Sequence, residues 1–171
     1  EQDKYTYQHS LGASIWGVAL GRQLGLPRSD LRSLAIGGLL FDIGKLRVDP
    51  ALLNSDHVLT SEELTAVREH VRHGIEMMAE TGLMNSDVLD MVAHHHERHN
   101  GSGYPQGLSG DAIPIFARIA GIVDCYDAIT SHRSYARATS PSAAIKMLYD
   151  VKDIDFQAEL VEEFILSLIH I

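Results

Sequence analysis

The spacing of apolar residues constrains the fold of this chain more than any other feature of its sequence. Along nearly all of the 171 residues, apolar side chains recur three and four positions apart, which is helical spacing. We find no convincing strand pattern, internal repeat or low-complexity segment in the sequence. The sequence therefore predicts an all-α fold, a compact bundle of about seven helices.

Residues typical of helix ends divide the first part of the chain. Gly25 follows a helix predicted over residues 3–24 and marks its end. The next helix is predicted to start near Ser29 and to run into the segment FDIGK at residues 41–45. Asp42 then falls near the C-terminal end of this helix, followed by a loop over residues 46–59.

A capping box and several similar signals mark the remaining helices. Thr60 and Glu63 have capping-box spacing and predict one helix that continues to Gly82. Further helix starts are predicted at these positions: Asn85 or Ser86, Pro114, and Ser140 with Pro141. A last amphipathic helix is predicted to contain residues 156–168.

Length and composition suit one compact domain. The chain is 45% hydrophobic, which is enough apolar material for a single core. No apolar run reaches the roughly 18 to 20 residues that span a bilayer, and no leader pattern is present, so we expect a cytoplasmic domain. Both ends look cut, and residues 1–171 are expected to be one domain excised from a larger signalling protein with a sensor or receiver domain.

The acidic charge balance excludes one class of partner. The net charge is −9, whereas broad DNA binding needs a basic face that displaces counterions from phosphates. A phosphate ligand would instead need local positive charge. Metal ions supply such charge, and the ten histidines of the chain are suitable ligands.

The segment HHERHNGSGYP, at residues 95–105, indicates a metal site at a helix end. Its two adjacent histidines and one carboxylate lead into a glycine-rich turn. Neutral imidazoles and carboxylates are ligands for borderline or hard transition metals. Taken alone, the three histidines at 94–96 are also compatible with a solvated helix end, because neighbouring helical residues point about 100° apart. Asp127, one helical turn after Asp124, is expected either to orient a ligand or to cap a surface turn.

Four separated motifs make the chain resemble the HD-GYP domain family of bacterial signalling hydrolases. They are FDIGK at 41–45, His70 in HVRHG, the segment 95–105, and Asp124 in VDCYDAITSHRSY. The resemblance extends from His9 to about Phe164 and implies a helical fold of the HD superfamily.

The resemblance implies a centre of one or two divalent metal ions bridged by a carboxylate, and such ligation suits iron or manganese. It implies these ligands: His9, Asp42 and Asp124 for a first ion, and Asp42, His70, His95 and His96 for a second. Phe41 stands where the family motif has a histidine, and phenylalanine cannot coordinate a metal. Tyr5 replaces the carboxylate of the trinuclear members, which argues against a third ion.

The resemblance also implies residues for catalysis and substrate binding. Asp42 and Lys45 would be catalytic, with Lys45 neutralising a phosphate oxygen; read without the motif, Lys45 is an exposed lysine at a helix end. The implied substrate contacts, besides Lys45, are Gly103, Tyr104 and Pro105 in the loop and Arg133, Tyr135 and Arg137 further along. Asn100 stands where the family usually has aspartate, and Ser134 and Ala136 also depart from its pattern.

What the resemblance implies is a phosphodiesterase that opens cyclic di-GMP to pGpG or GMP. Metal ions would polarise the phosphoryl oxygens and generate hydroxide for in-line attack. The alternative is a catalytically degenerate module that binds metal, cyclic di-GMP or a partner protein such as a diguanylate cyclase (GGDEF) and signals without hydrolysis. A nucleotide phosphohydrolase of the wider HD superfamily is a third reading, against which the intact Gly-Tyr-Pro loop argues. The sequence favours hydrolysis, because only Phe41 departs from the implied ligand set.

Overall fold

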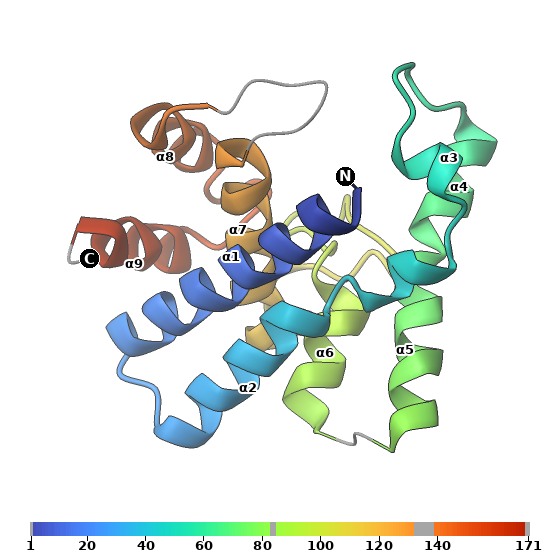
Figure 1. Ribbon diagram of the computed structural model, residues 1–171. Coiled ribbons are helices and arrows are strands. Elements are labelled where there is room, and N and C mark those ends of the chain that lie inside the picture. Colours follow the sequence, from blue (N-terminus) through green and yellow to red (C-terminus); the bar gives the residue numbers. More distant parts are fainter. Residues whose placement is uncertain (1, 83–84, 132–138, 170–171) are drawn as a thin grey trace.

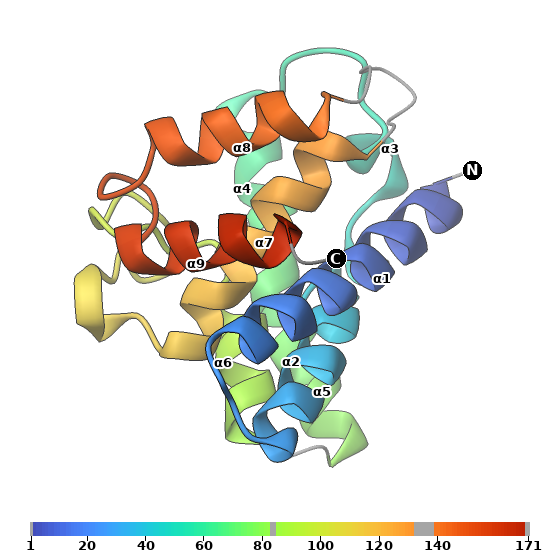
Figure 2. The ribbon, with the colours of Figure 1, turned by 90° about the vertical axis from the view of Figure 1, so that its left-hand side faces the viewer.

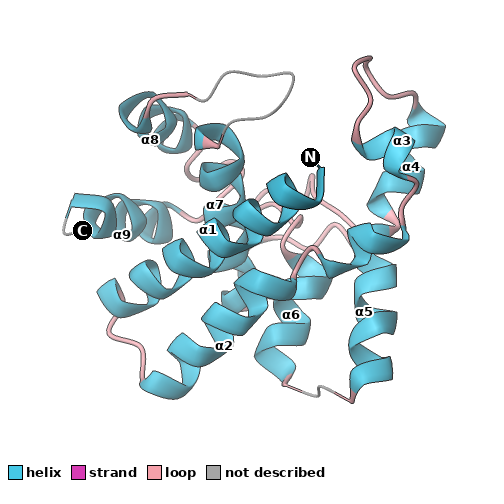
Figure 3. Cartoon of the chain, in the orientation of Figure 1, coloured by secondary structure: helices cyan, strands magenta, loops and turns pink. Residues whose placement is uncertain are grey.

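The computed structural model describes residues 2–82, 85–131 and 139–169 (Figure 3). In these ranges the chain forms α-helices, two short 3₁₀ helices and connecting loops. Extended pairing in the described part of the chain consists of two isolated bridges, Asn100–Ser109 and Lys152–Phe156. The prediction of an all-α fold is confirmed.

The described residues form nine α-helices, two more than the number expected from the sequence. Their bounds, with those of the 3₁₀ helices, are α1 (Gln2–Gln23), α2 (Arg28–Leu40), η1 (Ile43–Arg47), α3 (Pro50–Leu53), α4 (Ser61–Arg68), α5 (His70–Thr81), α6 (Ser86–His94), η2 (Gly110–Ala112), α7 (Ile115–Thr130), α8 (Pro141–Asp150) and α9 (Ala158–Ile169). The short helix α3 in the expected loop is one addition, and the separation of α4 from α5 is the other.

The prediction of one helix from the capping box to Gly82 is wrong, because the helix breaks at Glu69. Its start is as expected: the Thr60 hydroxyl accepts a hydrogen bond from the amide of Glu63, and the Glu63 carboxylate accepts one from the amide of Thr60. His70 explains the break. Its ring Nδ1 bonds the carbonyl of Val67 at 2.8 Å, and a continuous helix would offer this carbonyl to a backbone amide one turn later.

Helices α1 and α7 occupy the middle of the molecule (Figure 1). Helix α1 lies along α2 and also packs on α7 and α9, while α2 packs on α6. Helix α5 packs on α6 and on η1. Turned by 90°, the molecule shows α8 and α9 stacked beside each other next to α7 (Figure 2). This arrangement brings α1, α2, α5, α6 and α7 together around the segment that follows α2.

The main hydrophobic core is centred on α7. Its apolar face contributes Ile119, Ile122 and Tyr126, all of which are buried. Phe41, directly after α2, belongs to the same core and is 0% exposed. Burial of this ring at the end of α2 places the next residue, Asp42, inside the protein. Among the described residues, no helix combines the length and apolar character needed to cross a membrane.

Candidate metal centre

All six residues predicted as metal ligands converge in two groups that share Asp42. The four-ligand group consists of Asp42, His70, His95 and His96, and the three-ligand group of His9, Asp42 and Asp124. Within each group, the atoms able to bind a metal lie within 4.8 Å of one another. The structure therefore brings together side chains from five different segments of the chain.

Close backbone packing positions Asp42. This residue precedes η1, and Gly44 in η1 lies directly against the start of α5. A Cβ atom on Gly44 would lie 1.9 Å from the carbonyl oxygen of His70 and 2.4 Å from the amide nitrogen of Gly74. The glycine of the FDIGK motif therefore lets the segment carrying Asp42 approach the helix carrying His70.

Backbone carbonyls orient two of the histidines. His70 and His95 direct their Nδ1 atoms to carbonyl oxygens of Val67 and Met91, at 2.8 and 2.9 Å. Their Nε2 atoms then face Oδ1 of Asp42, at 3.4 Å for His70 and 3.6 Å for His95. A carbonyl bonded to one ring nitrogen fixes the tautomer that leaves the other nitrogen available to a metal.

The four-ligand group has the properties of a metal site. Oδ1 of Asp42 and Nε2 of His95 are buried and make no hydrogen bond in the structure. Such atoms are costly to bury unless a further ligand engages them. Burial lowers the pKa of His70 to about 4 and lowers that of His96 well below its ordinary value, so both imidazoles are neutral at pH 7. The donor set thus fits a divalent transition metal ion.

His9 lies between two carboxylates. Its Nε2 is 2.9 Å from Oδ1 of Asp124, and its Nδ1 is 2.8 Å from Oδ2 of Asp127. Burial alone would lower the pKa of His9, but the hydrogen bonds to Asp124 and Asp127 outweigh it and raise the pKa to about 9. Of the two roles expected for Asp127, the structure shows the first, orientation of a predicted ligand.

The sequence did not reveal the residue that allows Asp127 to approach His9. A Cβ atom on Gly12, one helical turn after His9 in α1, would lie 1.9 Å from Oδ1 of Asp127. A side chain at position 12 would therefore displace the Asp127 carboxylate from its place beside His9. Nothing in the sequence of α1 alone shows this, because the contact joins residues that are far apart in the chain.

Phe41 lies between the two groups of ligands. Its ring makes edge contacts with the rings of His9 and His95, at centroid distances of 5.7 and 4.8 Å. The position of the missing family histidine is thus filled by a hydrocarbon ring. Lys45 is next to Asp42 on the other side, where its ammonium group pairs with Oδ2. The pKa of Asp42 is well below its ordinary value, because Lys45 and the histidines outweigh the effect of burial.

The Gly-Tyr-Pro loop closes over His96. The Tyr104 ring stacks on the His96 ring at 4.5 Å, and the Arg68 guanidinium lies 4.7 Å from the centre of the Tyr104 ring. The Tyr104–Pro105 peptide bond is cis. A Cβ atom on Gly103 would lie 2.4 Å from the carbonyl oxygen of His96, so only glycine fits without a backbone shift.

Glu97 holds this loop in place, a role that was not predicted from the sequence. Its buried carboxylate accepts hydrogen bonds from the amides of Gln106 and Leu108, at 2.8 and 2.9 Å. Asn100, where the family usually has aspartate, accepts one from the amide of Ser102 at 2.9 Å. Both side chains thus order the turn, as a carboxylate or amide oxygen can.

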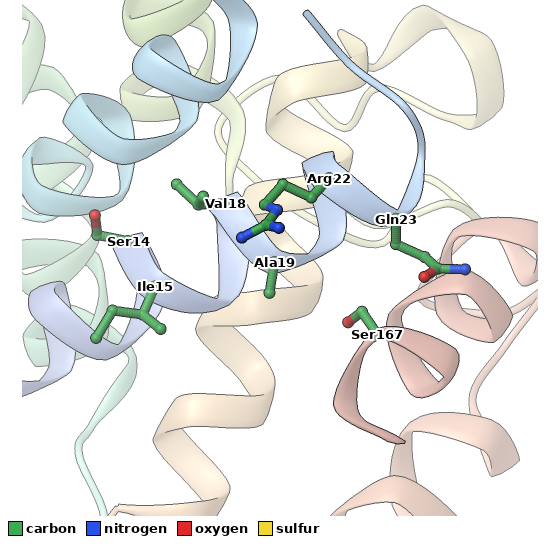
Figure 4. Close-up of a pocket in the computed structure, with 7 residues that line it drawn as sticks. All are labelled: Ser14, Ile15, Val18, Ala19, Arg22, Gln23 and Ser167. Atoms are coloured by element: carbon green, nitrogen blue, oxygen red, sulfur yellow. The ribbon is translucent and has the colours of Figure 1, made fainter. Parts of the chain in front are cut away.

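Three predicted substrate contacts, Arg133, Tyr135 and Arg137, lie outside the described residues. Elsewhere, a surface hollow of about 570 Å³ runs along α1 beside α9 (Figure 4). It is lined by Ser14, Ile15, Val18, Ala19, Arg22, Gln23 and Ser167. None of these residues belongs to either of the two ligand groups.

The fold and the two ligand groups define an all-α domain with a candidate histidine–aspartate metal centre. The sequence matches the HD domain model over residues 4–159, and the chain belongs to the HD domain family. The prediction that it is of the HD-GYP type is confirmed.

Similar proteins include several named phosphodiesterases. Cyclic di-GMP phosphodiesterase PA4108 of Pseudomonas aeruginosa is 40% identical over 146 residues, which are 85% of this chain and 35% of that protein. The cyclic di-GMP phosphodiesterase response regulator RpfG of Xanthomonas campestris pv. campestris is 37% identical over 131 residues, 76% of this chain and 35% of that protein. The chain therefore spans about a third of the length of these relatives.

Two further matches concern the substrate class and the fold. The 3'3'-cGAMP-specific phosphodiesterase 2 of Vibrio cholerae is 30% identical over 162 residues, 94% of this chain and 31% of that protein. The solved structure of Bd1817, a HDG"Y"P protein from Bdellovibrio bacteriovorus, matches with a TM-score of 0.79 and 20% identity. It covers 97% of this chain and 53% of that chain, and at this identity the match shows the shared fold.

The raised pKa of His9 predicts a pH dependence for the metal-free protein. The folded pKa of about 9 exceeds the ordinary value of 6.5, so the stabilisation is fully present below pH 6.5 and is lost as the pH rises through 9. The free energy of unfolding should fall by roughly 3 kcal/mol over this range. Urea denaturation at several pH values measures it. In His9→Gln the decrease should disappear, and an equal decrease in this variant would show that another group causes it.

Removal of the Glu97 carboxylate should loosen the Gly-Tyr-Pro loop. Glu97→Ala leaves the amides of Gln106 and Leu108 without their acceptor, which should lower the free energy of unfolding by about 3 kcal/mol in denaturant titrations. Asn100→Ala is the control, since the exposed Asn100 accepts a single bond and its loss should cost less than about 1 kcal/mol. Equal losses in the two variants would contradict a special role of Glu97.

Proposed function

We propose that the protein is a metal-dependent phosphodiesterase that hydrolyses cyclic di-GMP to pGpG or GMP. The observation that carries this proposal is the four-ligand group, whose buried Asp42 and His95 atoms lack hydrogen-bond partners directly beside the Gly-Tyr-Pro loop. Relatives at 37 and 40% identity carry the name of this activity. Because the chain spans about a third of their length, we also propose that residues 1–171 are one domain of a larger signalling protein.

The proposed centre would hold iron or manganese, which suit mixed imidazole and carboxylate ligands. A bound ion would polarise the phosphoryl oxygens of the substrate and lower the pKa of a water molecule. Lys45 would neutralise a phosphate oxygen of the substrate, since its side chain is 27% exposed; its ammonium group also pairs with Asp42. Tyr104 would orient His96 through ring stacking.

The remaining proposed contacts lie around this centre. Gly103 and Pro105 would shape the loop against which the substrate binds. Arg133, Tyr135 and Arg137 are proposed to hold its phosphates, on the strength of the sequence resemblance alone. The diguanylate cyclase (GGDEF) and a receiver or sensor domain are proposed partners, in line with the response regulator among the relatives.

Turnover of cyclic di-GMP tests the proposed activity. Anaerobically purified protein loaded with iron or manganese should release pGpG or GMP, separated by chromatography. His95→Ala, which removes one member of the four-ligand group, should release none. Parallel assays with 3'3'-cGAMP decide between the two substrate classes found among the relatives. Equal turnover by wild type and His95→Ala would show that the activity belongs to another site or to a contaminant.

Phe41 favours a second candidate function, a module that binds cyclic di-GMP or a partner protein without hydrolysis. This ring is 0% exposed and takes the position of a family ligand, so the centre departs from the hydrolytic pattern. Calorimetric binding of cyclic di-GMP by the metal-loaded protein, with no product after prolonged incubation, would support this function. Product formation that depends on His95 would exclude it.

A further inference from the structure

The two ligand groups differ in how their atoms are engaged. In the four-ligand group, Oδ1 of Asp42 and Nε2 of His95 are buried without hydrogen bonds. The Nε2 atoms of His70 and His96 form a hydrogen bond with each other at 3.2 Å, which an ion bound by both nitrogens would replace. Two nitrogens that each lie about 2.1 Å from one ion, at a right angle to each other, would be about 3 Å apart. This group therefore has both the available atoms and the spacing for one ion.

The ligand atoms of the three-ligand group are already engaged with one another or with a cation. Nε2 of His9 bonds Oδ1 of Asp124 at 2.9 Å, while its Nδ1 bonds Asp127. Oδ2 of Asp42 is the oxygen nearer to His9, at 3.8 Å, and it pairs with the ammonium group of Lys45. A metal ion here would have to displace both the His9–Asp124 hydrogen bond and the lysine.

Phe41 cannot provide a further metal ligand that would compensate for the loss of these two interactions. Its ring contacts both His9 and His95 and is fully buried in the core around α7. It offers hydrocarbon at the position where a fourth ligand would be needed. A divalent ion with few protein ligands against an apolar wall is poorly solvated, which disfavours binding.

We propose that the protein binds a single metal ion, at Asp42, His70, His95 and His96, and that Phe41 keeps the three-ligand group free of metal. In this centre, Lys45 provides the positive charge at Oδ2 of Asp42 that a second ion would otherwise supply. The inference deepens the proposed function and rests on its metal centre. It is independent of turnover, because metal content is measured without substrate.

Metal content per chain tests the inference. Wild-type protein is loaded anaerobically with Mn(II) and freed of excess ions by gel filtration. Inductively coupled plasma mass spectrometry then measures the number of manganese ions per chain. We expect about one ion per chain in wild type and about two in Phe41→His, with Phe41→Leu as the apolar control that stays at one. Two ions per wild-type chain would overturn the proposal. So would one ion in a folded Phe41→His, as judged by circular dichroism.

A second pair of variants keeps the test decisive if Phe41→His does not fold. Asp124→Asn changes only the three-ligand group, and His95→Ala changes only the four-ligand group. The proposal expects the single ion to persist in Asp124→Asn and to be lost in His95→Ala. Loss of the ion in Asp124→Asn but not in His95→Ala would place the ion in the three-ligand group and overturn the proposal. Intact metal content without turnover of cyclic di-GMP would instead contradict the proposed function alone.

Discussion

Asp42→Asn is expected to reduce bound metal to less than about a tenth of an ion per chain and to lower phosphodiester turnover at least about 10³-fold. Asp42 is the residue common to both ligand groups, and its Oδ1 atom faces His70 and His95 at 3.4 and 3.6 Å. Asparagine has the same shape but lacks the charge, so the loss reports on metal binding rather than on packing. Metal analysis and product chromatography on the same sample measure both effects.

The control for this variant is the same chemical change at an exposed position. Asp56→Asn, in the loop before α4, should leave both metal content and turnover at wild-type levels. The folded state of Asp42→Asn is checked by circular dichroism. Full metal content in a folded Asp42→Asn protein would contradict the assignment of Asp42 to the centre.

Gly44→Ala is expected to have the second large effect, a fall of about 3 kcal/mol in the free energy of unfolding together with loss of bound metal. The added Cβ would lie 1.9 Å from the carbonyl oxygen of His70 and 2.4 Å from the amide nitrogen of Gly74, both backbone atoms. Either η1 or α5 must then move, which separates Asp42 from His70. Chemical denaturation and metal analysis measure the two consequences.

Gly17→Ala is the matched control for this substitution. A Cβ atom on Gly17, in the middle of α1, would meet its nearest neighbour, the carbonyl oxygen of Leu34, at an ordinary 3.8 Å. Because alanine is the better helix former, this variant should be as stable as wild type or more stable by up to about 1 kcal/mol. If Gly44→Ala behaved like Gly17→Ala, the close packing of η1 on α5 would not be what positions Asp42.

Most helices could be predicted from the sequence, because their signals are local. The capping box at Thr60, the side-chain cap of Asn85 on the amide of Val88 and the left-handed Gly82 all lie at the expected helix ends. The break at Glu69 could not be predicted in this way. It depends on the His70 ring, which bonds a carbonyl in the preceding turn while it faces Asp42 from a distant segment.

The members of the candidate centre were predicted from the resemblance to the HD-GYP family, whereas the way they are held was not predicted. His9 and Asp124 were recognisable from their motifs, but the choice between the two roles of Asp127 required its position beside His9. The role of Gly12 could not be predicted, because its contact with Asp127 joins α1 to α7, which are far apart in the sequence. Glu97 was recognised as part of the segment 95–105, but its role could not be predicted, because its partners are backbone amides, which are the same in every sequence.

The contacts that shape the Gly-Tyr-Pro loop join residues that are close together in the sequence. Glu97 bonds the amides of Gln106 and Leu108, Tyr104 stacks on His96, and Gly103 approaches the backbone of residues 96–98. All of these partners lie within residues 95–108, so closing the loop costs only the entropy of a short chain segment. Two histidines of the candidate centre are therefore joined to the loop above them by local contacts, while the amides of His99 and Asn100 attach the same segment to the carbonyls of Asp155 and Ile154.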